Sequence, residues 1–257
     1  VLYSAHGFLM YAIAARSVGA APMAAPERDL KADVDALLAR VTPRTRVLFL
    51  ANPNNPTGSY LSGAEVARLH AGLPPDVLLV IDAAYAEYAD APDYDDGAAL
   101  VRQHDNVVMT RTFSKIHGLA ALRLGWAFCS EQVVSVLNRV RGPFNVSQAA
   151  LAAGCAAVAD QAHLARSKAH NSACRAGLIE SLSAIGLDPR PSLGNFLLVR
   201  FPEGAEVAAA ALAALKAEGI LLRSMNGYGL PDCLRMTVGT DEEAAACVEA
   251  LQEIRGA

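Results

Sequence analysis

One lysine in this sequence lies in a setting that could support covalent catalysis. Thr112 and Ser114 lie just before Lys115, and Arg123 follows eight residues later. A lysine amine can form a Schiff base with an aldehyde cofactor, and hydroxyl groups with a guanidinium can hold a phosphate that anchors such a cofactor. Exposed Ser-Lys pairs are also common, so the significance of this segment depends on two segments upstream of it.

Those two segments carry residues of matching chemistry. Asn55 lies within Asn-Pro-Asn-Asn-Pro-Thr-Gly, and Asp82 begins Asp-Ala-Ala-Tyr, which ends at Tyr85. A buried carboxylate such as Asp82 can stabilise a protonated ring nitrogen and keep a cofactor ring a strong electron sink. Tyr85 and Asn55 could bond an oxygen on the same ring. Taken singly, Asp82 could cap a turn, Tyr85 could be a core aromatic, and the segment around Asn55 could be a simple turn.

Two arginines are candidates for an anion site. Arg235 lies inside an apolar strand sequence, Leu-Arg-Met-Thr-Val-Gly, where burying a cation is costly unless it is paired. It could form a structural salt bridge, or it could clamp a substrate carboxylate or phosphate through two hydrogen bonds. Arg223, in Leu-Leu-Arg-Ser, poses the same question with less support.

Composition limits the class of protein. The chain has 257 residues, of which 53% are hydrophobic and 19% charged, so it can bury a substantial core. Its formal net charge of −4 does not indicate a positively charged surface that would bind nucleic acid or an acidic membrane. Its apolar runs are all shorter than the roughly 18 residues of a membrane span. We therefore expect no nucleic-acid partner and no membrane partner.

The cysteines and histidines show no pattern of a disulfide framework or a metal site. Five widely spaced cysteines without a Cys-x-x-Cys pair indicate reduced thiols in a cytosolic protein. The six histidines lack the spacings that metal ligands usually show, so no metal site is predicted. The sequence also begins without methionine and without the basic end of a signal peptide, which leads us to expect a piece of a longer protein.

Apolar runs alternate with helical patterns in the first part of the chain, which is typical of an α/β architecture. Asn55, Asp82 and Lys115 each lie at or just beyond the carboxyl end of a predicted strand. Ligands bind at that edge of open α/β sheets, so we expect these three residues to meet in one crevice. Strands are predicted at 47–51, 77–81, 106–110 and 124–129, and helices at 62–72 and 131–141.

The pattern changes near residue 160, where long alanine-rich helices begin to dominate. This change predicts a large domain over residues 1–160 and a smaller α+β domain over residues 161–257. Helices are predicted at 147–159, 162–185, 206–218 and from 241, and strands at 196–201, 220–223 and 234–238.

With these residues identified, the chain resembles the fold-type-I pyridoxal-phosphate aminotransferases, and within them most resembles the histidinol-phosphate aminotransferase family. The resemblance covers the whole chain and depends on segments 52–58, 114–123 and 234–239. It implies an α/β fold in which a mostly parallel sheet lies between helices, followed by the smaller C-terminal domain. It also implies a cytoplasmic homodimer with pyridoxal 5'-phosphate as cofactor. The implied reaction moves an amino group between histidinol phosphate and 2-oxoglutarate in histidine biosynthesis.

The resemblance assigns roles around the cofactor ring. Lys115 would be the Schiff-base lysine and the general base for the α proton. Asp82 would pair with the pyridine nitrogen, while Tyr85 and Asn55 would bond the ring oxygen. Phe8, in Gly-Phe-Leu-Met-Tyr, matches the aromatic residue that stacks on the ring.

The resemblance also assigns roles at the two anionic groups. Thr112, Ser114 and Arg123 would hold the cofactor phosphate. Arg235 would bind the anionic end of the substrate, either the phosphate of histidinol phosphate or a carboxylate of glutamate, and Arg223 would assist it. Family members also carry an upstream segment with a glycine-rich turn, an amino-terminal arm and a tyrosine donated across the dimer, none of which this sequence contains.

Four other functions fit the same residues. An aromatic amino-acid aminotransferase or a threonine-phosphate decarboxylase would use nearly the same scaffold, because anion-binding arginines serve all of these enzymes. A cofactor-sensing domain of a transcription regulator would follow a helix-turn-helix that lies outside this sequence. The last alternative is a catalytically inactive fragment.

Overall fold

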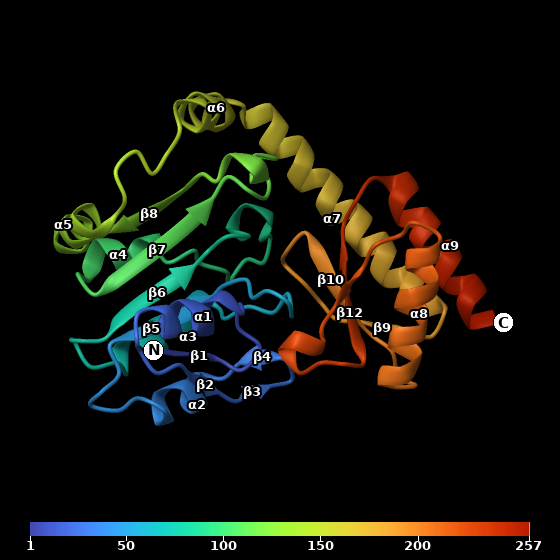
Figure 1. Cartoon of the computed structure of the whole chain (residues 1–257), viewed down its shortest axis with the longest axis horizontal. Coiled ribbons are helices and arrows are strands. Elements are labelled where there is room, and N and C mark those ends of the chain that lie inside the picture. Colours follow the sequence, from blue (N-terminus) through green and yellow to red (C-terminus); the bar gives the residue numbers. More distant parts are fainter. Residues whose placement is uncertain (257) are drawn as a thin grey trace.

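A six-stranded sheet forms the centre of the larger of two lobes in the computed structural model, which describes residues 1–256 (Figure 1). The strand order is β2-β1-β5-β6-β7-β8, and neighbouring strands run parallel except for β8, which pairs with β7 in the antiparallel sense. The strands are β1 (Leu2–Ser4), β2 (Met23–Ala25), β5 (Val47–Ala51), β6 (Leu78–Asp82), β7 (Val107–Thr112) and β8 (Gly125–Cys129).

The central strands form where the sequence is continuously apolar, as expected for parallel strands covered on both faces. Strand β5 has the bounds predicted for it, while β6 and β7 extend past their predicted ends to Asp82 and Thr112. Helix α3 begins with the expected capping box, in which Ser62 and Glu65 bond each other's backbone N–H groups. The helices of this lobe are α1 (Met10–Ser17), α2 (Val34–Ala39), α3 (Gly63–Ala71), α4 (Ala98–Gln103) and α5 (Glu131–Val140).

The first forty residues and α4 were not predicted from the sequence. Their elements are short, so they carry little periodicity to read. Residues 1–40 supply β1, β2, α1, α2 and a small antiparallel hairpin formed by β3 (Glu27–Arg28) and β4 (Lys31–Ala32).

The smaller lobe is built on a four-stranded antiparallel sheet in the order β11-β12-β10-β9. The predicted strand 220–223 is wrong in its extent, because only Arg223–Ser224 pair in the sheet while Ile220 and Leu222 pack against the lobe's core as irregular chain. The elements from α6 onward are α6 (Gln148–Ala159), α7 (Gln161–Ala184), β9 (Asp188–Pro189), β10 (Phe196–Arg200), α8 (Ala205–Ala217), β11 (Arg223–Ser224), β12 (Cys233–Thr237) and α9 (Asp241–Gly256).

Helix α7 links the two lobes. It extends from the end of α6 into the smaller lobe, where it packs against α9 (Figure 1). Ser172 and Arg175 on α7 also bond Asp90 of the larger lobe, at 3.1 and 3.4 Å. Each lobe has its own apolar core, and the division into domains near residue 160 stays a prediction.

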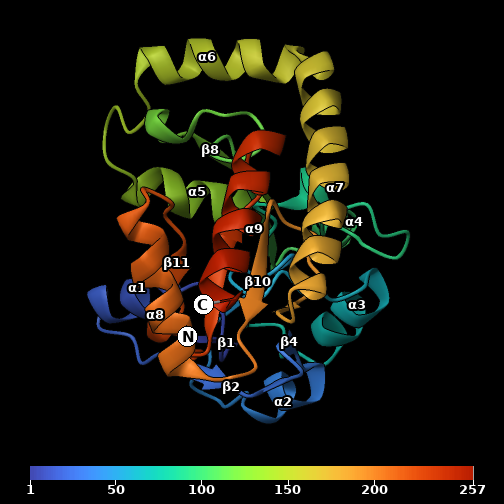
Figure 2. The ribbon, with the colours of Figure 1, turned by 90° about the vertical axis from the view of Figure 1, so that its right-hand side faces the viewer.

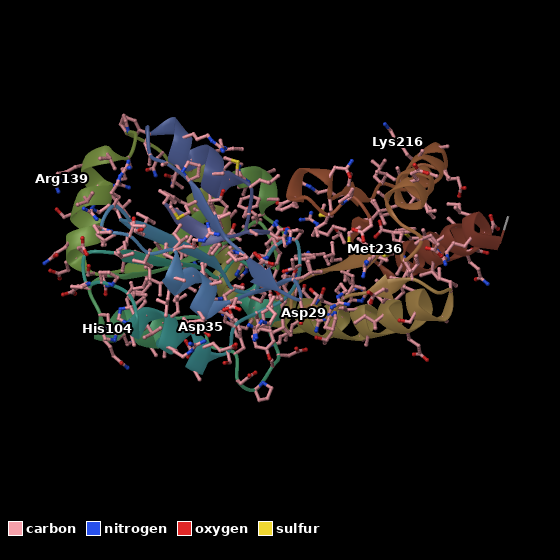
Figure 3. All side chains as sticks on the ribbon, turned by 90° about the horizontal axis from the view of Figure 1, so that it is seen from below. Asp29, Asp35, His104, Arg139, Lys216 and Met236 are labelled. Carbon is pink, nitrogen blue, oxygen red and sulfur yellow. The ribbon has the colours of Figure 1, made fainter. Side chains whose placement is uncertain are left out.

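The lobes also meet at the loop that follows β5. Gly58 has a φ of +74°, and a Cβ there would lie within 2.8 Å of three atoms of Ser192. The Leu193 N–H donates to the Gly58 carbonyl at 3.0 Å. Seen from below, Asp29 lies at this junction, while Met236 lies in the smaller lobe (Figure 3). Among residues 1–256 no helix is long and apolar enough to cross a bilayer.

Two asparagine side chains make this loop rigid. Asn52 is fully buried, and its amide donates to the Leu61 carbonyl at 3.0 Å while accepting from the Leu61 N–H at 2.8 Å. Asn54 donates to Thr57 Oγ1 at 2.9 Å. The Asn52 bonds satisfy buried backbone groups of Leu61 and the Asn54 bond joins two side chains, so together they hold the loop that presents Asn55.

We expect Asn52→Ala to lower the free energy of unfolding by on the order of 2–4 kcal/mol, because it leaves the N–H and the C=O of Leu61 buried without partners. Urea denaturation followed by circular dichroism measures this change. Asn138→Ala, at an exposed position of α5, is the control and should change stability by less than about 0.5 kcal/mol. Equal stabilities of the two variants would contradict the structural role of Asn52.

Candidate active site

The carboxyl ends of three neighbouring parallel strands carry the predicted chemical groups. Asp82 is the last residue of β6 and pairs in register with Ala51 at the end of β5 and with Thr110 on β7. Asn55 follows β5, and Lys115 follows β7. The three residues therefore follow neighbouring strands at one edge of the sheet, and their meeting in one ligand crevice stays a prediction.

Asp82 is a largely buried carboxylate held by hydroxyl groups. Tyr11 Oη donates to Asp82 Oδ2 at 2.7 Å, and Thr110 Oγ1 lies 3.5 Å from Asp82 Oδ1. Burial raises the pKa of Asp82 above its ordinary value, although the bond from Tyr11 and the charge of Lys115 act against this shift. Asp82 is thus a negative charge that neutral donors compensate only in part.

Tyr11 is a site residue that the sequence analysis did not identify. It stacks on Phe49, with 4.7 Å between ring centroids, and burial together with Asp82 raises the pKa of its hydroxyl well above the usual value. Phe8 packs edge-on against the Tyr11 ring at 6.0 Å. The short spacing from Phe8 to Tyr11 in the sequence was the only available signal, since the contact with Asp82 depends on how α1 packs.

Lys115 is half-buried, and its surroundings disfavour the charged form of its amine. Burial lowers the pKa of Lys115, and the positive charge of Arg235 lowers it further. Lys115 Nζ lies 5.3 Å from the centroid of the Tyr85 ring. Burial also raises the pKa of Tyr85 to about 12, so its hydroxyl stays protonated near neutral pH and can donate a hydrogen bond.

Arg235 reaches from the smaller lobe into the crevice. Its Nη1 donates to Asn55 Oδ1 at 2.5 Å, and its guanidinium lies 5.1 Å from the centroid of the Phe196 ring. Because the Asn55 oxygen accepts from Arg235, the Asn55 NH₂ group is left as a donor. The Phe196 ring also contacts Tyr85 edge-on at 5.1 Å, so Arg235 and Tyr85 pack on one aromatic residue.

The two candidate arginines lie directly opposite each other. Arg223 on β11 pairs in register with Arg235 on β12. Like charges at opposed positions of a sheet repel, and burial followed by the charge of Arg223 lowers the pKa of Arg235. Within residues 1–256 no carboxylate forms a salt bridge with either arginine. A bound anion would relieve this repulsion.

The predicted phosphate-binding residues are brought together only in part. Thr112 Oγ1 accepts from the Ser114 N–H at 3.0 Å, so one turn holds both hydroxyl groups. Arg123 is exposed, has a φ of +55°, and donates to the Ala120 carbonyl at 2.6 Å. Its charge contributes to lowering the pKa of Lys115, which places it near the same turn.

Tyr228 is a second residue that sequence reasoning missed. It is 6% exposed, and its hydroxyl has no hydrogen-bond partner in the part of the chain that the structure describes. It packs in a small apolar cluster with Leu198, Met225 and Cys233, and its backbone carbonyl lies 2.9 Å from His6 Nδ1. The sequence offered no signal beyond an aromatic residue in a glycine-rich turn.

Comparison with known proteins identifies the family. The model of the family "Aminotransferase class I and II" matches residues 1–251. This chain belongs to the class I and II aminotransferases. The predicted α/β fold of the fold-type-I enzymes is confirmed by this match and by related structures.

The relatives are similar over the whole chain. The chain is 59% identical to the histidinol-phosphate aminotransferase of Paramagnetospirillum magneticum, over all of its own length and 71% of that protein. It is also 59% identical to the enzyme of that name from Rhodospirillum centenum, over 98% of the chain and 69% of that protein. The solved histidinol-phosphate aminotransferase from Sinorhizobium meliloti, in complex with pyridoxal-5'-phosphate, is 30% identical with a TM-score of 0.93, over 100% of this chain and 70% of that chain.

We expect Arg235→Gln to shift the reaction of Lys115 with aldehydes to higher pH. Removing the nearby cation favours the charged amine, so the pKa of Lys115 rises and a higher pH is needed to produce the reactive neutral form. The measurement is the rate of pyridoxal 5'-phosphate capture across pH, trapped by borohydride reduction and assigned to Lys115 by peptide mapping. Arg139→Gln, exposed on α5, should leave the profile unchanged, and a shift of Arg235→Gln to lower pH would contradict the assignment.

Proposed function

We propose that this protein is a pyridoxal-phosphate aminotransferase that moves an amino group between histidinol phosphate and 2-oxoglutarate. The observation that carries the proposal is the opposed pair Arg223 and Arg235. Their two positive charges act on the Lys115 amine, and no carboxylate in the described part of the chain forms a salt bridge with either. A dianionic phosphate monoester fits two arginines better than a single carboxylate does. The identity to relatives of that name supports the same substrate.

The residues present fit the cofactor. The buried carboxylate of Asp82 fits a protonated pyridine nitrogen, because the positive charge of that nitrogen would balance the negative charge of Asp82. The protonated Tyr85 hydroxyl and the free NH₂ of Asn55 fit a phenolate oxygen. The turn that holds Thr112 and Ser114 fits the phosphate, with Arg123 nearby.

The chemistry divides between cofactor and protein. When bound, pyridoxal phosphate supplies an electron sink for the pair released as the Cα–H bond of the amine substrate breaks. Asp82 holds the proton on the ring nitrogen. Lys115 Nζ, with its lowered pKa, takes the α proton as general base and returns a proton as general acid. Arg223 and Arg235 hold the substrate anion, which orients the α carbon toward Lys115.

Assembly and location follow from the family resemblance. The substrates are small molecules, and we extend the proposal to a homodimer in the cytoplasm. Sedimentation velocity of the purified full-length protein tests the dimer.

We expect Lys115→Ala to reduce turnover of histidinol phosphate by at least 10³-fold, because it removes the general base and the covalent attachment of the cofactor. Stopped-flow absorbance of the cofactor during a single turnover measures this loss. Lys168→Ala, which removes a lysine that bonds the Ala89 carbonyl, is the control and should retain activity. Normal turnover of Lys115→Ala would refute the assignment of Lys115.

The same spectroscopic assay separates the substrates. Histidinol phosphate, phenylalanine and phosphothreonine are titrated separately into the cofactor-loaded protein, and carbon dioxide is measured with the last. The proposal is supported if histidinol phosphate converts the cofactor to its aminated form at a lower concentration than phenylalanine or phosphothreonine does. Preference for phenylalanine would make the enzyme an aromatic aminotransferase, and carbon dioxide release would make it a decarboxylase.

We expect Arg223→Gln to lower kcat/KM for histidinol phosphate by about 10- to 100-fold, because a charge-assisted hydrogen bond contributes roughly 1.5–3 kcal/mol. The loss should fall mainly on KM, since Arg223 is placed to bind rather than to transfer a proton. Steady-state kinetics measure it, with Arg139→Gln as the matched surface control. An unchanged KM would remove Arg223 from the substrate site.

A further inference from the structure

Three side chains with the chemistry of metal ligands meet outside the candidate active site, where α7 packs against α9 (Figure 2). His170 and Cys174 are four residues apart on α7 and therefore lie on one face of that helix. Asp241 is the first residue of α9. One ligand atom from each of the three lies within 4.8 Å of the others.

We propose that His170, Cys174 and Asp241 form a binding site for a zinc-type divalent metal ion. Imidazole nitrogen, thiolate sulfur and carboxylate oxygen are the ligands that zinc binds in proteins. In a tetrahedral zinc site the ligand atoms lie about 3.3–3.8 Å from one another, as the metal–ligand distances require. The present spacing of up to 4.8 Å exceeds that range by about 1 Å, so the side chains must move closer together when the ion binds.

A hydrogen bond already orients the histidine. His170 Nε2 lies 2.8 Å from the carbonyl oxygen of Gly239. A carbonyl can only accept, so Nε2 carries the proton and the neutral ring keeps its lone pair on Nδ1. Metal-binding histidines commonly donate their other ring N–H to a backbone carbonyl in this way. The bond also ties the segment before Asp241 to α7.

The surroundings leave space for a fourth ligand. Cys174 is largely buried, whereas His170 and Asp241 are exposed, so an ion can enter from solvent. A hollow of about 650 Å³ between α7 and α9 is lined by Cys174 and Asp241. Water from this hollow can complete a tetrahedral shell, as it does where a protein supplies three ligands.

The consequence is a metal-dependent crosslink within the smaller lobe. The ion would join α7 to the start of α9, and because it binds the folded state it would raise the melting temperature as the free metal concentration exceeds its dissociation constant. Sequence spacing did not reveal this site, because Asp241 lies on a different helix from His170 and Cys174. The proposal does not depend on the aminotransferase reaction.

The test uses the full-length, cofactor-loaded protein, reduced and freed of metals. Zinc chloride is titrated by isothermal calorimetry, and cobalt(II) chloride is titrated while the d–d absorption of tetrahedral cobalt is recorded. We expect one equivalent of zinc to bind and to raise the melting temperature, and cobalt to give the tetrahedral spectrum.

Variants assign the ligands. Cys174→Ser and Asp241→Asn should each weaken zinc binding at least tenfold, whereas Cys155→Ser, at an exposed cysteine of α6, should bind zinc as the parent does. Because Asp241 is exposed, we expect Asp241→Asn to fold, and it can test the site even if Cys174→Ser does not fold. Absence of stoichiometric zinc binding, or equal binding by the parent and Asp241→Asn, would overturn the proposal.

Discussion

The buried carboxylate of Asp82 is the constraint on which the site depends. A negative charge at the end of a central strand is costly to bury, and the hydroxyl groups of Tyr11 and Thr110 offset part of that cost. Tyr11 is fixed by this requirement, because its hydroxyl must reach Asp82 while its ring stacks on Phe49. The Asp82 charge also opposes the effects of burial and of Arg235 on the Lys115 amine. The Asp82 charge therefore acts on the pKa of both Tyr11 and Lys115, in addition to the effect of burial.

The second constraint is the contact between the lobes. Arg235 on β12 donates to Asn55 in the loop after β5, and the backbone around Leu193 bonds Gly58 of the same loop. The buried Asn52 holds this loop through its two hydrogen bonds to the backbone of Leu61. The smaller lobe therefore packs on this loop, and the contact brings Arg235 to the carboxyl end of β5.

The sequence predicted the residues at strand ends because continuous apolar runs stop where a polar residue begins. Asp82 was identified in this way, whereas Lys115 was identified from Thr112, Ser114 and Arg123 around it. Tyr11 and Tyr228 were not, because their place in the site depends on how a short helix and a short turn pack, which no local pattern encodes. The opposition of Arg223 and Arg235 was also hidden, since it depends on the register between two strands and one of them is only two residues long.

The Asn55–Arg235 bond joins residues 180 positions apart in the chain. Closing a contact of such large sequence separation costs more chain entropy than closing a nearer one. The larger lobe can order its sheet from nearer contacts, whereas the crevice needs the last strands of the chain. The Asn55 side chain therefore has its hydrogen-bond partner only when the end of the chain has packed, so a chain that lacks its last strands would leave this loop without that partner.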